Sequence, residues 1–171
     1  MDIKTLKDLY ADLLRDMVSG EKQMIEALPK MAEAAETPEL KQAFQNHLAE
    51  TQGQLDRLEQ IFTMLNMSSS GETCDAMKGL VKEGKKVIDH AKVEEVRDAG
   101  LIAAGQKVEH YEIGSYGTLV AMAKILGETK HAQLLEQTLN EEKAADQKLN
   151  QIAIGHVNKL AASASRDKKA A

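Results

Sequence analysis

The chain has 171 residues, a formal net charge of −5 and 29% charged side chains, which is typical of one soluble domain. The acidic balance disfavours general binding to nucleic acid or to an anionic membrane. The single cysteine, Cys74, excludes an intrachain disulfide and fits a reducing compartment. Neither a secretory signal nor an apolar run of about 18 residues is visible, so the expectation is a cytoplasmic protein with no membrane or nucleic-acid partner.

The first half of the chain predicts two long helices joined by a tight turn. The first is expected from an N-cap at Asp2 to about Ala35, with apolar side chains every three or four residues at Leu6, Leu9, Tyr10, Leu13, Met17, Met24, Leu28 and Met31. Pro29 lies in this run and predicts a kink or a break. Thr37 can cap the second helix, and Pro38 suits its first position. The second helix then ends near the serine-rich stretch 68–71.

The second half predicts a short helix and two more long ones. The short helix covers about 74–90, the third long helix about 95–126, and Gly127 is a good helix stop. The fourth long helix runs from Thr129 towards Leu160, and residues 162–171 read as a flexible basic tail. The tight turns make two antiparallel hairpins, 2–66 and 95–161, joined by a long connection, 67–94. This order predicts one all-α domain over 1–161, a ferritin-like four-helix bundle whose single long crossover carries a short fifth helix.

An internal repeat links the two hairpins at an offset of 91 residues. The segment EKQMIEALPKMA at 21–32 aligns with EIGSYGTLVAMA at 112–123, so Glu21 corresponds to Glu112. The same offset pairs Glu50 with Glu141, and Phe44, Leu48, Leu58 and Ile61 with apolar residues. The similarity predicts a bundle with pseudo-two-fold symmetry.

Several carboxylates lie on helix faces that should be apolar. Glu21, Glu112 and Glu142 each fall four or seven residues from apolar stripe positions, with Glu109 one turn before Glu112 and Asp146 one turn after Glu142. A buried, unpaired carboxylate costs several kcal/mol or becomes protonated, and several together repel one another. A bound cation removes both costs, so the pattern indicates a metal site.

The heights of these acids along the bundle also agree. Glu21 and Glu50 are equidistant from the first predicted turn, and Glu112 and Glu141 are equidistant from the second. Two-fold packing then brings all four to one centre. The candidate metal ligands are Glu21, Glu50, Glu109, Glu112 and Glu142, with Asp146, Gln54 and Glu141 as further candidates. Oxygen ligands of this kind suit a divalent metal, with iron favoured and manganese, magnesium or calcium as alternatives.

A simpler interpretation applies to each acid alone, because a glutamate at the edge of an apolar stripe can reach water. Glu50 lies to one side of its stripe, with His47 and Gln54, and Glu142 is better phased than Glu141. His47 and His110 lie near the acids, but an isolated histidine is more often structural than a ligand. Cys74 has no neighbouring base and is given no role.

The sequence resembles the YciE/YciF-like ferritin-like proteins, bacterial stress-associated proteins, in four stretches: SGEKQ at 19–23, HLAETQGQ at 47–54, RDAGLIAAGQKVEHYEIGSYGTL at 97–119 and LNEEKAADQKL at 139–149. The resemblance implies a ferritin-like bundle, often dimeric, with a carboxylate-rich metal site and an activity that is not settled. Di-iron ferritin-like proteins usually place a histidine three residues after a glutamate on two helices. Here Gly53 follows Glu50 at that spacing and Ala144 follows Glu141.

Two classes of function remain open from the sequence. The first is a metal-binding stress-response protein whose carboxylate site, with one or two ions, reacts ferrous iron with oxygen or peroxide as a ferroxidase-like or peroxidase-like centre. The second is a non-enzymatic helical scaffold, or a homodimeric interaction protein, without redox turnover. A DNA-protecting shell is disfavoured by the acidic balance, since only Arg166, Lys168 and Lys169 in the tail favour it.

Overall fold

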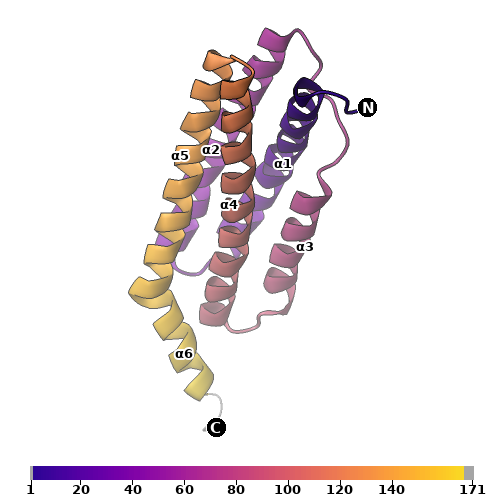
Figure 1. Cartoon of the computed structure of the whole chain (residues 1–171). Helices are drawn as coiled ribbons and strands as arrows, with labels where there is room; N and C mark the ends of the chain where they lie inside the picture. Colours follow the sequence, from indigo (N-terminus) through magenta and orange to yellow (C-terminus); the bar gives the residue numbers. More distant parts are fainter. Residues whose placement is uncertain (1, 168–171) are drawn as a thin grey trace.

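A computed structural model describes residues 2–167, and every regular element in that range is helical. The long helices are α1 (Leu6–Ala34), α2 (Pro38–Leu65), α4 (Glu94–Ile125) and α5 (Thr129–Ile152), with the shorter α3 (Asp75–His90) between the hairpins. Figure 1 shows α1, α3 and α5 running one way along the bundle and α2 and α4 the other way. This is the predicted ferritin-like arrangement, in which the crossover makes α2 and α4 parallel. None of the described helices is long and apolar enough to cross a membrane.

Helix α1 differs from the prediction at both proline and N-cap. It begins after Thr5, not Asp2, because Thr5 and Asp8 form a capping box in which each side chain accepts a hydrogen bond from the other residue's backbone N–H. The helix also continues past Pro29 to Ala34 without a break. Pro29 is exposed, so the backbone carbonyl that loses its donor lies on the solvent side of the helix.

The turn between α1 and α2 is held by the start of α4 rather than by a local side-chain cap. Thr37 is the N-cap residue of α2 but makes no side-chain capping bond. Instead, the buried Asp98 carboxylate accepts hydrogen bonds from the backbone N–H groups of Glu36 at 3.0 Å and Thr37 at 2.7 Å. Arg97 donates to the Ala34 carbonyl at 2.8 Å. These contacts fix the first hairpin against the second.

The hydrophobic core is divided into two parts along the bundle axis. One lies towards the α1–α2 turn and contains Met24, Phe44, Leu101 and Leu149 among its buried residues. The other lies towards the α4–α5 turn and contains Leu14, Phe62, Tyr116 and Leu135. Buried polar side chains from four helices occupy the level between them, so the apolar packing on each side holds that level rigidly.

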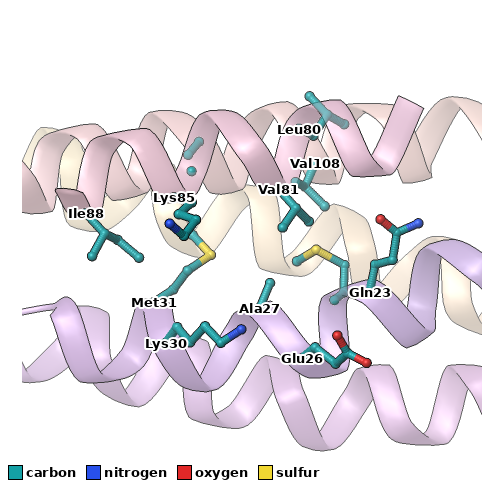
Figure 2. A pocket seen from close by; sticks show the side chains of 13 residues that line it. Gln23, Glu26, Ala27, Lys30, Met31, Leu80, Val81, Lys85, Ile88 and Val108 are labelled. Carbon is teal, nitrogen blue, oxygen red and sulfur yellow. The ribbon is translucent and has the colours of Figure 1, made fainter. Parts of the chain in front are cut away.

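Helix α3 covers one side of the bundle by packing on α1 and α4. Its N-cap is Cys74, which is buried and lies 3.1 Å from the Tyr111 hydroxyl and 3.2 Å from Asp16. Figure 2 shows the contact between α1 and α3, where Ala27, Met31, Val81 and Ile88 line a small cavity of about 150 Å³. Apart from Gln23, Glu26 and two lysines at its rim, the lining is apolar, as expected for a helix-packing groove.

The C-terminal helix differs from the predicted continuous fourth helix. After α5 the chain makes one π-helical turn, Ala153–Val157, and continues as α6 (Asn158–Asp167), which packs against α4. The helix therefore extends into the segment 162–171 that the sequence predicts as a flexible basic tail. Positions 168–171 of that tail lie outside the described residues.

Replacing Asp98 by asparagine tests how the two hairpins are joined. The change removes a charged acceptor and presents an amide N–H to a backbone donor, so we expect Asp98→Asn to lower the free energy of unfolding by about 2 kcal/mol, within the range for hydrogen bonds to charged groups. Urea denaturation followed by far-ultraviolet circular dichroism measures it. Glu94→Gln, an exposed change in the same helical turn, is the control, and an equal loss in both variants would contradict the assigned role of Asp98.

Candidate metal centre

A polar layer crosses the middle of the bundle between the two apolar parts of the core. Helix α1 contributes Glu21, α4 contributes Glu109 and Glu112, and α5 contributes Glu142. Helix α2 contributes His47, Thr51 and Gln54. All of these side chains are buried, and none of the four glutamates exposes more than 2% of its surface.

Four of these residues converge on one point. His47, Glu109, Glu112 and Glu142 each offer a ligand atom, and these atoms all lie within 4.8 Å of one another. The His47 Nε2 atom is 3.4 Å from a Glu109 oxygen and 3.7 Å from a Glu142 oxygen. Groups at such separations can share a single ion or a pair of ions after small rotamer adjustments.

Most of the inward-facing oxygens have no hydrogen-bond donor among the described residues. Within the layer, six buried oxygens of five side chains have no hydrogen-bond partner among the described residues: Glu21 Oε2, Gln54 Oε1, Glu109 Oε2, both oxygens of Glu112, and Glu142 Oε2. Buried polar atoms are almost always paired in folded proteins, because leaving one unpaired costs about 1–3 kcal/mol. Six such atoms in one layer, four of them on the converging Glu109, Glu112 and Glu142 side chains, are the arrangement expected around a metal site.

The remaining oxygens of the layer are held by neutral donors. The Tyr116 hydroxyl donates to Glu21 Oε1, and the Gln54 amide donates to Glu142 Oε1. Each of these bonds orients a carboxylate through one oxygen and leaves the other oxygen without a hydrogen bond among the described residues. Contacts of this kind around a metal site fix the ligands and tune their basicity.

Burial and mutual repulsion disfavour the charged state of these acids. Burial raises the pKa of Glu21, Glu109 and Glu112 well above the usual range, and neighbouring carboxylates, Glu142 among them, raise it further. Burial alone would lower the pKa of His47, but its hydrogen bond to Glu50 and the nearby Glu142 carboxylate outweigh this effect and raise the pKa. Two like charges 4 Å apart repel by about 4 kcal/mol at an effective dielectric constant of 20. A cation converts that repulsion into attraction.

The donor set fits a divalent transition metal. Carboxylate oxygens suit magnesium, calcium or manganese, and the imidazole nitrogen of His47 adds a ligand that also suits iron, zinc and other transition metals. Glu50 lies 3.4 Å from the other ring nitrogen, Nδ1. A carboxylate in that position holds the proton on Nδ1 and leaves the Nε2 lone pair facing Glu109 and Glu142.

Three sequence-predicted ligands lie outside the polar layer. Glu50 is exposed and touches only the outer edge of the His47 ring. Glu141 forms a two-pronged ion pair with Arg57, at 2.6 and 2.7 Å, and Arg57 lowers the pKa of this carboxyl despite its partial burial. Asp146 is half-buried and accepts a hydrogen bond from Gln106 at 3.1 Å. Of the predicted set, Glu21, Glu109, Glu112, Glu142 and Gln54 reach the polar layer.

His47 is the residue of the cluster that the sequence interpretation placed at the side of its helix. The signal was its spacing, because His47 lies four residues before Thr51 and seven before Gln54, and all three are buried on one face of α2. The 91-residue repeat explains why the symmetric expectation failed. It pairs His47 with Thr138 and Thr51 with Glu142, so each hairpin contributes one ligand from a different turn of its second helix.

The comparisons with known proteins agree over almost the whole chain. Residues 5–162 match the family described as a domain of unknown function, DUF892. The chain is 50% identical to Protein YciF of Escherichia coli over 162 residues, which cover 94% of this chain and 98% of that protein. The crystal structure of that E. coli stress protein superposes with a TM-score of 0.88, covering 92% of this chain and 99% of the other.

Two further solved structures show the same fold. The protein YcfI from Rhodopseudomonas palustris is 46% identical with a TM-score of 0.85, covering 87% of this chain and 95% of that chain. A Xanthomonas campestris protein at 22% identity has a TM-score of 0.73, covering 96% of this chain and 99% of the other, and shows the fold alone. With the family matched from residue 5 to 162, this chain belongs to the DUF892 family, as a homologue of the E. coli stress protein YciF.

Proposed function

We propose that this protein is a metal-binding stress-response protein that holds divalent iron in the buried cluster of His47, Glu109, Glu112 and Glu142, with Glu21 as a further ligand. The observation that carries the proposal is the set of six unpartnered, buried oxygens from five side chains in one layer of the core. Its charge agrees, because two divalent ions balance four carboxylates. The stress context comes from the similarity to the E. coli stress protein.

The proposed chemistry is the reaction of ferrous iron with oxygen or peroxide. Each ferrous ion bound there would give one electron to the oxidant, so that two ions with two protons would reduce one hydrogen peroxide to two waters, and the carboxylates would stabilise the higher charge of the ferric product. The protein residues hold the ions in a layer that excludes bulk water. Tyr116 and Gln54 keep Glu21 and Glu142 oriented while the charge at the centre changes.

The test of this function is an anaerobic titration of the metal-stripped protein with ferrous iron, followed by addition of oxygen or hydrogen peroxide. We expect saturable binding measured by equilibrium dialysis, and then a near-ultraviolet ferric band that rises faster than with iron in buffer. In Glu112→Gln we expect the affinity for ferrous iron to fall by at least about 100-fold. Replacing a residue that only hydrogen-bonds to a metal ligand typically costs less.

Glu136→Gln is the matched control, because Glu136 is an exposed glutamate on α5 outside the polar layer. It should bind and oxidise iron like the wild type. Absence of saturable binding in the wild type would overturn the proposed metal site. Saturable binding without accelerated oxidation would overturn only the redox part.

A second prediction concerns stability without metal. Replacing buried ion pairs by apolar side chains of similar volume is often neutral or stabilising by about 1–4 kcal/mol. Glu112 has no hydrogen-bond donor to lose among the described residues, so the same reasoning applies to it alone. We therefore expect Glu112→Met to have a higher free energy of unfolding than the wild type in excess chelator, measured by urea denaturation. The order should reverse with metal, because a ligand at 100 times its dissociation constant stabilises the native state by about 2.7 kcal/mol.

The decisive comparison is between Glu112→Met and the wild type, both in excess chelator. If Glu112→Met is less stable than the wild type in chelator, the carboxylates are held by proton sharing within the layer and do not require a cation. Glu136→Met, an exposed position on α5, controls for the effect of the methionine itself.

A further inference from the structure

The buried cluster is connected to the protein surface by a cavity between α2 and α5. The cavity has a volume of about 420 Å³, and its lining includes two residues of the cluster, His47 and Glu109. Its walls carry small side chains, Ala43 on α2 and Ala144 and Ala145 on α5. Glu109 lines this cavity with one buried oxygen that has no hydrogen-bond partner among the described residues.

The side chains along this cavity form a series from solvent to core. The side chain of Glu50 is 47% exposed, that of His47 is 6% exposed and that of Glu109 is 3% exposed. The steps between them are equal, because Glu50 lies 3.4 Å from His47 Nδ1 and Glu109 lies 3.4 Å from His47 Nε2. Beyond Glu50, the next ligand atoms along the cavity are thus His47 Nε2 and the Glu109 carboxylate, since Nδ1 keeps its proton.

On the second hairpin, the position equivalent to Glu50 is occupied by an ion pair. The counterpart of Glu50 is Glu141, which is fixed by Arg57, and Arg57 also donates to Thr138 at 2.8 Å. Among the described residues, Glu50 has no ion pair with a lysine or arginine. The charged residues that line its cavity are Glu39, Glu50 and Lys148 besides the buried Glu109, so the mouth is negative overall.

The cavity between α1 and α3 lacks these features. The groove between α1 and α3 in Figure 2 contains Glu26 at its rim, but its inner lining is apolar and includes no residue of the cluster. A hydrated ion that entered it would lose water without gaining a ligand, which costs several kcal/mol.

We infer that the cavity between α2 and α5 is the route by which divalent metal ions reach the buried cluster, and that Glu50 is the outer carboxylate that takes the ion from solvent and passes it to His47 and Glu109. The inference rests on the proposed metal site and adds to it a separate, kinetic role. A partly exposed carboxylate attracts the hydrated ion and replaces its waters stepwise. It therefore speeds both loading and release, in addition to orienting His47.

The test is rapid mixing of metal-stripped protein with cobalt(II), followed by its visible absorption, and of the loaded protein with excess chelator. We expect Glu50→Gln to slow loading by about tenfold, the lower end of the range for electrostatic steering into a charged cleft. Release should slow as well, but by a smaller factor than loading, because the variant also loses the hydrogen bond that orients His47 and its dissociation constant rises. Ala145→Leu, which narrows the cavity without removing a charge, should slow both rates too. Glu26→Gln, an exposed glutamate in the other groove, should change neither rate.

The outcomes separate the inference from the proposed function. If the wild type binds no cobalt at equilibrium, the metal site fails and the route fails with it. If the wild type binds cobalt and Glu50→Gln loads at the wild-type rate, only the route is overturned. If Glu50→Gln weakens the dissociation constant by as much as it slows loading, Glu50 only orients His47 and the transfer role is overturned.

Discussion

Four glutamates are buried in one layer of the bundle, and the electrostatic repulsion among them is the main constraint on the structure at this level. Burial and mutual repulsion raise the pKa of Glu21, Glu109 and Glu112, so these side chains are costly to keep charged. An apolar layer of the same volume would be more stable on its own. The proposed cation would offset this cost, and proteins accept local instability where a site needs it.

The two apolar parts of the core make this layer rigid. Residues on either side of it pack the same four long helices, and the turn at Glu36 is locked to α4 through Asp98. The ligands therefore come from elements that are fixed at both ends, which suits a preorganised metal site better than a loop does. The seam between α2 and α5 at Glu50 combines small side chains and an opening to solvent with two residues of the cluster, His47 and Glu109.

The fold could be predicted from helical periodicity and turn signals, because both act locally and repeat along the chain. The depth of Glu21, Glu112 and Glu142 followed from the same periodicity. Glu50 and Glu141 were misplaced because equal distance from a turn gives height along a helix and not direction around it. His47 was missed because the repeat gives no matching ligand on the second hairpin, where Thr138 stands at the position equivalent to His47. The ion pair between Glu141 and Arg57 is a contact between helices that no local pattern contains.

The most direct test is X-ray diffraction from crystals grown with ferrous iron under anaerobic conditions, with data collected above and below the iron absorption edge. The anomalous difference map should show its strongest peak inside the bundle, within bonding distance of His47 Nε2 and of the Glu109, Glu112 and Glu142 carboxylates. A peak only at surface acids such as Glu50, or none in crystals whose titrated protein is saturated, would contradict a metal centre in this layer.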